Sequence, residues 1–140
     1  MDGGRIAALS ATLAATLLCT GACASPDSHS PAPPAPEMPA GWSVVSDFDV
    51  PVEQTRAIEE KLGVDLISVR NTLYDVDGQS VQLNVMVAGD AGEADALMAE
   101  LRSMKGEVAL LRKGLTIYEF VGPNEVLPLI AAGRAHLESQ

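Results

Sequence analysis

Apolar and polar residues alternate along the chain after Gly41, and the period of this pattern changes from one segment to the next. Valine and leucine recur at every second position of the segment 79–88, with polar side chains at most of the positions between them. Such alternation is typical of a β-strand that packs one face on a core and leaves the other face wet or lightly covered. Shorter stretches of strand-like pattern predict further strands at 42–48, 64–74, 107–112 and 115–121.

Other segments repeat their apolar residues at the spacing of an α-helix. Pro51 and Gly63 flank the first of them, because proline suits the first turn of a helix and glycine suits its C-terminal end. Asp90 and Glu93 have the spacing of a capping box at the start of the second, and Gly106 ends it. Helices are therefore expected at 52–62, between 90 and 106, and from 123 to about 138.

The predicted elements follow one another in the order β-α-β-β-α-β-β-α. Asp77 and Gly78 join the second and third strands, and both residues tolerate the positive φ of a tight hairpin. The first six elements have the order of a ferredoxin-like βαββαβ sandwich. The sequence therefore predicts an α+β domain of this kind, in which an additional C-terminal strand extends the sheet edge and the last helix covers an edge or an open face.

A different pattern occupies the N-terminus, where an uncharged run of small and apolar residues follows a short charged start. This arrangement is typical of a secretion signal peptide. The run leads to Thr20-Gly21-Ala22-Cys23, which resembles the lipobox of bacterial lipoprotein precursors, with Thr20 where leucine is usual. The resemblance covers the first 24 residues. It implies cleavage just before Cys23, whose thiol then carries a diacylglyceryl group.

Two alternatives to lipidation of Cys23 stay open. Ala22 and Ala24 flank the cysteine as the small residues of an ordinary signal-peptidase site, which would place the cleavage after Ala24. The uncharged residues 6–24 are also just long enough to cross a bilayer as an uncleaved helix, although alanine, threonine, serine and glycine favour insertion only weakly. The expectation is an exported protein whose domain lies on the extracytoplasmic side of the cell membrane or outer membrane.

Residues 25–41 hold six of the nine prolines of the chain. Proline has a fixed φ and no backbone N–H, so this segment is expected to be an extended spacer outside any helix or sheet. The chain thus divides into a signal peptide at 1–22, a lipidated cysteine with a proline-rich linker at 23–41, and one globular domain at 42–140.

Acidic residues outnumber basic residues by 19 to 9, and the net charge of −10 argues against binding to nucleic acid. Both cysteines, Cys19 and Cys23, precede the linker, so the domain has neither a disulfide nor a thiolate ligand. The sequence has no phosphate-binding loop, dinucleotide fingerprint or zinc-protease motif. His29 and His136 stand apart from other ligands at metal-binding spacing, so neither a metal nor a cofactor is expected.

Carboxylates gather at two places in the domain. Asp47, Asp49 and Glu53 surround the start of the first predicted helix, where they favour its positive end. Asp75 and Asp77 flank the hairpin, where turn formation explains both, and the spacing of a calcium loop is not met. A hydrolase with paired carboxylates needs two such groups in one cleft, which sequence spacing alone does not show.

Tyr118 and Phe120 share one face of the predicted strand 115–121, and the opposite face of this strand is apolar as well. Either the last helix packs over the two aromatic side chains, or they form an exposed patch for a partner. The sequence as a whole predicts a membrane-anchored extracytoplasmic lipoprotein whose domain is a non-catalytic binding or accessory module, with an envelope protein as a candidate partner. A small envelope enzyme or inhibitor that uses carboxylates is the alternative.

Overall fold

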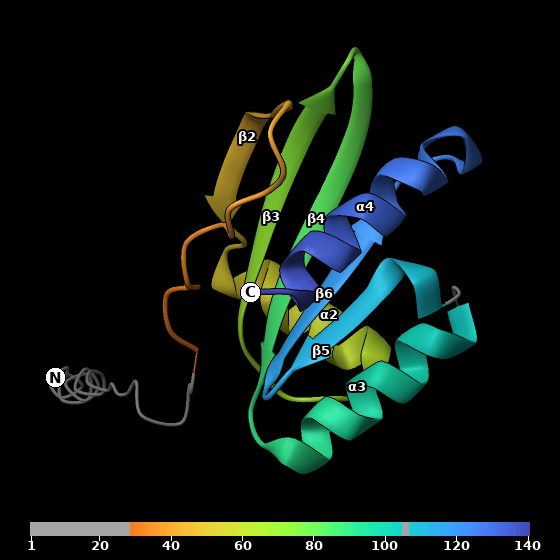
Figure 1. Ribbon diagram of the computed structural model, residues 1–140. Coiled ribbons are helices and arrows are strands. Elements are labelled where there is room, and N and C mark those ends of the chain that lie inside the picture. Colours follow the sequence, from red (N-terminus) through yellow and green to blue (C-terminus); the bar gives the residue numbers. More distant parts are fainter. Residues whose placement is uncertain (1–28, 105–106) are drawn as a thin grey trace, which may run out of the picture.

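The computed structural model describes residues 29–104 and 107–140 (Figure 1). The expected signal peptide, its expected cleavage context Thr20-Gly21-Ala22 and the expected lipidation site Cys23 lie outside the described residues, and so does Gly106. Within the described ranges a β-sheet forms the central layer, and helices cover parts of both of its faces.

In the described part of the chain, five antiparallel strands form the sheet in the spatial order β2-β3-β4-β6-β5. The strands are β2 (Trp42–Asp49), β3 (Leu66–Val76), β4 (Gln79–Ala88), β5 (Leu110–Lys113) and β6 (Thr116–Val121). The helices are α2 (Val52–Leu62), α3 (Ala91–Met104) and α4 (Leu127–Glu138), with short 3₁₀ turns η1 (Glu107–Ala109) and η2 (Asn124–Val126) before β5 and α4. Among these helices, none is long and apolar enough to cross a membrane.

The α+β class is confirmed, whereas the ferredoxin-like strand order is not. A split βαβ unit needs parallel strands, but β2 and β3 are antiparallel neighbours although α2 connects them. The expectation that the last strand extends the sheet edge is wrong, because β6 lies between β4 and β5. Apolar residues on both faces of β6 suit this interior place. The strand at this edge of the sheet is the four-residue β5. It follows a 3₁₀ turn and does not begin at 107.

Several short sequence motifs form the helix ends and turns expected of them. Gly63 ends α2 in the left-handed conformation, with a φ of 70°. Asp77 and Gly78 form the turn between β3 and β4 with φ values of 53° and 82°, as a tight hairpin turn requires. Oδ1 of Asp90 accepts a hydrogen bond from the backbone N–H of Glu93 at 2.8 Å, and this contact caps the start of α3.

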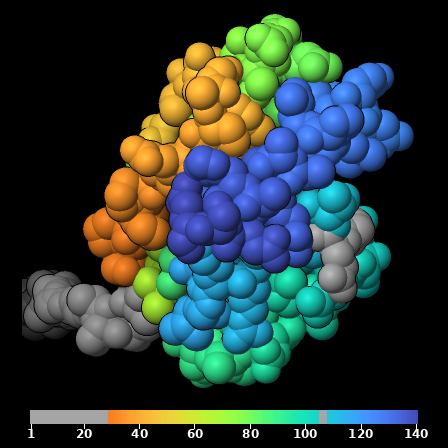
Figure 2. Space-filling model, viewed as in Figure 1, coloured from red at the N-terminus to blue at the C-terminus, as the bar shows by residue number. Residues whose placement is uncertain are grey.

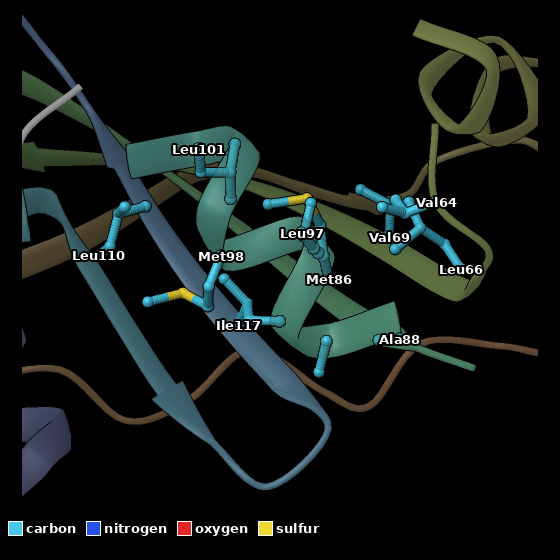
Figure 3. Packing of buried hydrophobic residues seen from close by; sticks show 11 residues of the cluster. Val64, Leu66, Val69, Met86, Ala88, Leu97, Met98, Leu101, Leu110 and Ile117 are labelled. Atoms are coloured by element: carbon cyan, nitrogen blue, oxygen red, sulfur yellow. The ribbon is translucent and has the colours of Figure 1, made fainter. Parts of the chain in front are cut away.

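On one face of the sheet, α2 and α3 cover a cluster of buried side chains that we call the α3 core. Figure 3 shows side chains of this cluster on α3 and on the neighbouring strands, with Val64, Leu66 and Val69 to one side of α3. Leu97 and Leu101 of α3 pack in this cluster with Met86 of β4 and Ile117 of β6. Burial of each such side chain stabilises the fold by roughly 1.5–3 kcal/mol, which holds α3 on the sheet.

The opposite face carries a second cluster under α4, which we call the α4 core. Trp42 packs edge-on against Tyr74 and Phe120, with ring centroids 5.4 and 6.4 Å apart. Gly133 of α4 lies against the rings of Trp42 and Phe120, because a Cβ added there would be only 2.8 Å from the first and 3.2 Å from the second. The absence of a side chain at this position therefore lets α4 approach the sheet closely.

Residues 29–41, the second part of the expected linker, lie along the domain beside α4 (Figure 2). We call this segment the strap. The backbone N–H of Ser30 donates to the carbonyl oxygen of Ile67 at 2.9 Å. The backbone N–H of Ala32 donates to Oδ1 of Asp49 at 3.3 Å. The strap thus begins with hydrogen bonds to two strands of the sheet.

Side chains of the domain also bind the carbonyl groups of the strap. Nη1 of Arg70 donates to the oxygen of Pro33 at 3.3 Å, and Nε2 of Gln140 donates to the oxygen of Glu37 at 3.2 Å. Met38 packs against the α4 core. The expected lack of helix and strand in this segment is confirmed for the strap, but the strap contacts the domain along its length.

Replacement of Ala32 by proline removes the N–H that donates to Asp49 and is compatible with an extended backbone. A hydrogen bond of this kind contributes roughly 0.5–1.5 kcal/mol, so Ala32→Pro is expected to raise the exchange rate of the Ser30 amide roughly two- to tenfold. Amide hydrogen exchange followed by NMR measures this rate.

Ala35→Pro is the matched control, because Ala35 also stands between two prolines. Its N–H donates no hydrogen bond to any described residue. An equal rise in both variants would show that added proline, and not the lost hydrogen bond, loosens the strap.

Candidate functional site

A row of polar side chains crosses the sheet on the face that α2 and α3 partly cover. Asn71 of β3, Asn84 of β4 and Glu119 of β6 are direct cross-strand partners. Nδ2 of Asn71 donates to Oδ1 of Asn84 at 2.8 Å, and Nδ2 of Asn84 donates to Oε1 of Glu119 at 2.9 Å. Gln82 also donates to Oδ1 of Asn84, at 3.1 Å. We call these four residues the amide row.

Strand periodicity places the amide row on the same face as the α3 core. Asn84 precedes Met86 by two residues on β4, and Glu119 follows Ile117 by two residues on β6. Met86 and Ile117 are buried in the α3 core, whereas Asn84 and Glu119 are only partly buried. The amide row therefore begins where the helical cover of this face ends.

Side chains from β2, α2 and α3 surround the amide row and form a cleft with a volume of about 360 Å³. The amide row forms its floor, and its apolar lining includes Phe48, Ile58, Leu62, Met86, Leu101 and Met104. Gln54 and Lys61, both exposed on α2, add polar groups to the lining. A cleft of this size with mixed lining is typical of a small-molecule site.

The amide row keeps hydrogen-bonding capacity toward the cleft. Oδ1 of Asn84 accepts two hydrogen bonds within the row, which fixes the orientation of this side chain. The side-chain oxygens of Asn71 and Gln82, in contrast, accept no hydrogen bond from the described residues. Each of these two amide groups also has a second N–H to donate. Both side chains can therefore accept from and donate to a ligand in the cleft.

The aromatic pair that the sequence singles out lies on the opposite face of the sheet from the cleft. Phe120 is 1% exposed in the α4 core, so this residue packs under the last helix. Tyr118 is partly buried against the same core, and burial raises the pKa of its phenol. Phe48, in contrast, is 47% exposed and lines the cleft.

Sequence reasoning did not identify Phe48 or the amide row as site residues. Gln82 and Asn84 are visible as the polar face of the clearest strand, but a polar face alone indicates only contact with solvent. Met86 and Ala88 are the signal available in the sequence, because apolar residues at the end of this polar face indicate that burial changes along the strand. The cross-strand partners of Asn84 depend on register, which the sequence does not reveal.

Asp47 and Asp49, expected to favour the start of the first helix, bind Arg70. Nε and Nη2 of Arg70 donate to the two carboxylate oxygens of Asp47 at 2.7 Å each, and Nη1 donates to Asp49 at 3.2 Å. The hydrogen bonds from Arg70 lower the pKa of Asp47 against the opposing effect of desolvation. Glu53 lies in the first turn of α2. None of these three carboxylates lines the cleft.

The other polar candidates, Asp75, His29 and His136, do not line the cleft. Oδ2 of Asp75 accepts the N–H of Gly78 at 3.4 Å across the hairpin turn. Nε2 of His29 lies 3.1 Å from Oε1 of Glu59, and His136 occupies the last turn of α4. Within residues 29–104 and 107–140, no three histidine, cysteine or acidic side chains are grouped closely enough to hold a metal ion.

Tyr74 carries a buried hydroxyl that has no hydrogen-bond partner among the described residues. Desolvation raises the pKa of Tyr74 to about 12, and the charge of Asp47 adds to this shift while Arg70 opposes it. An unperturbed tyrosine titrates near about pH 10. Between these two values the unfolded chain has lost a proton that the folded chain keeps, so stability falls as the pH rises from about 10 to about 12.

The variant Tyr74→Phe is expected to lack this part of the alkaline destabilisation. Relative to the variant, the wild-type protein should lose about 2 kcal/mol of unfolding free energy between about pH 8 and about pH 11.5. Below about pH 10 the variant should be as stable as the wild type or more stable, because the hydroxyl it lacks forms no hydrogen bond. Urea unfolding at both pH values measures the difference, and a constant difference would contradict the raised pKa.

Comparison of the chain with protein-family models, with curated proteins and with solved structures finds no match.

Proposed function

We propose that this protein is a membrane-anchored extracytoplasmic lipoprotein, that its domain is a non-catalytic binding module, and that the cleft is its ligand site. The cleft is the observation that carries the proposal. It is concave, has a volume of about 360 Å³ and combines apolar walls with the converging polar groups of the amide row. Such a lining can bind a small molecule and fix its orientation.

The side chains of the cleft suit binding better than carboxylate chemistry. Glu119 is the one acidic residue among the described residues that line it. Hydrolysis by paired carboxylates needs a second one in the same cleft. Asp47 and Asp49 alternate with Phe48 along β2, so their side chains point to the opposite face, where they bind Arg70. This arrangement gives no support to the alternative of an envelope enzyme that acts through these carboxylates.

The proposed lipid anchor is inferred from the lipobox-like sequence at Cys23. A diacylglyceryl group on this residue would hold the module on the membrane, because each buried CH₂ contributes about 0.8 kcal/mol. The strap then connects this anchor to the sheet through the contacts of Ser30 and Ala32. The module would thus present its cleft to molecules of the cell envelope.

Cys23→Ser is expected to release the protein from the membrane fraction or to leave the precursor unprocessed, since serine has no thiol to lipidate. Cys19→Ser is the matched control, because Cys19 lies in the same segment but outside the lipobox-like sequence. Membrane fractionation and mass spectrometry of the intact protein measure both outcomes. Processed Cys23→Ser protein that still sediments with membranes would contradict the lipid anchor.

A neutral apolar probe tests the cleft. When 1-hexanol is titrated into the full-length chain, NMR shifts are expected at Phe48, Ile58 and Met104. Phe48→Ser should weaken binding roughly fivefold, because about 1 kcal/mol of apolar contact is lost. Val45→Ser is the matched control, since Val45 is 61% exposed on the same strand and does not line the cleft. Absence of saturable shifts in the cleft would overturn the proposed ligand site.

A further inference from the structure

We infer that the ligand of the cleft is a neutral molecule with a secondary amide group on an aliphatic body. This inference rests on the proposed function, because it names the ligand class of the same cleft. Three properties of the lining lead to it: the hydrogen-bonding groups on the floor, the balance of charge, and the aliphatic character of the walls.

The floor offers both acceptors and donors. The side-chain oxygens of Asn71 and Gln82 accept no hydrogen bond from the described residues, and each amide retains an N–H. Asn84 holds both side chains in place, since its Oδ1 accepts from each of them. A secondary amide has one N–H and one C=O, so it can form one hydrogen bond of each kind with this floor. An ester of the same shape has no N–H, so it can only accept a hydrogen bond through its C=O.

Charge in the cleft favours a ligand without a net charge. Glu119 and Lys61 are the two charged residues among the described residues of the lining. Their charges are opposite and cancel, so the described lining has no net charge that would select an anion or a cation. A neutral group also avoids the cost of desolvating an ion.

Apart from Gln54 and Lys61 on α2, the walls of the cleft are apolar. Ile58, Leu62 and Leu101 offer no hydrogen bonds, so a sugar hydroxyl buried against them would stay unpaired. An aliphatic body can contact these side chains without leaving polar groups unpaired. A single amide group next to such a body meets both the floor and the walls.

N-isobutylacetamide is the probe, and isobutyl acetate and isovalerate are its matched analogues, with an ester and a carboxylate in place of the amide. In NMR titrations of the full-length chain, the amide is expected to bind roughly two- to tenfold more tightly than the ester, which corresponds to one hydrogen bond. Isovalerate should bind more weakly than either. The side-chain NH₂ resonances of Asn71 and Gln82 should shift with the amide.

Gln82→Met should reduce the preference for the amide over the ester, because methionine keeps the length of the side chain and loses its polar groups, while Asn71 keeps its own. Gln79→Met is the matched control on the same strand, since Gln79 is exposed and does not line the cleft. N-acetyl-leucine methylamide forms a second arm. Tighter binding than N-isobutylacetamide would identify a peptide as the source of the amide, and equal binding would identify a small acyl amide.

The outcomes separate the ligand class from the proposed function. If 1-hexanol binds in the cleft but the amide shows no advantage over the ester, or isovalerate binds best, the ligand class is overturned and the binding module stands. If neither 1-hexanol nor any of the amides shifts the cleft resonances, both proposals fail.

Discussion

Strand β4 is packed on both of its faces, and the rest of the structure depends on this double burial. The side chains on one face of the strand enter the α4 core. Near the end of the strand, the side chains on the other face enter the α3 core. The first set is Val81, Leu83 and Val85, and the second is Met86 and Ala88. A strand of ten residues thus joins both helical layers to one sheet.

The cleft follows from the unequal cover of these two faces. The helices α2 and α3 bury Met86 but leave Gln82 and Asn84 only partly covered on the same side of β4. Polar groups at such a place need partners, and Asn84 has three hydrogen bonds within the amide row. The hydrogen bonds of Asn84 are therefore formed within the sheet. The amides of Asn71 and Gln82 keep hydrogen-bonding groups for a ligand on the polar floor.

Elements of the fold were predictable from the sequence wherever the signal is local. The period of β4, the hairpin at Asp77 and Gly78, and the cap at Asp90 depend on neighbouring residues and appear as expected. The order of the strands was not predictable in this way, since pairing depends on how α2 returns the chain beside β2. An α-helix between two strands usually suggests a crossover to a parallel strand, whereas here it connects antiparallel neighbours.

The candidate site was predictable only in fragments, because it is assembled by register. Gln82 and Asn84 are visible as polar positions on a strand, but nothing local places Asn71 and Glu119 on either side of Asn84. The contacts of the proline-rich strap with the domain could not be predicted from the sequence either. Composition predicts an extended backbone without helix or strand, but it does not show that carbonyl groups and the remaining N–H groups of such a backbone bind the domain.

The strap also sets how far the domain can stand from Cys23. At no more than about 3.6 Å per residue, the distance from Cys23 to the sheet contact at Ser30 is limited to about 25 Å while the strap is bound. If the strap separated from the sheet as far as Trp42, the limit would rise to about 68 Å. If Cys23 carries the proposed lipid, a few hydrogen bonds between the strap and the domain would thus decide between a short tether and one more than twice as long.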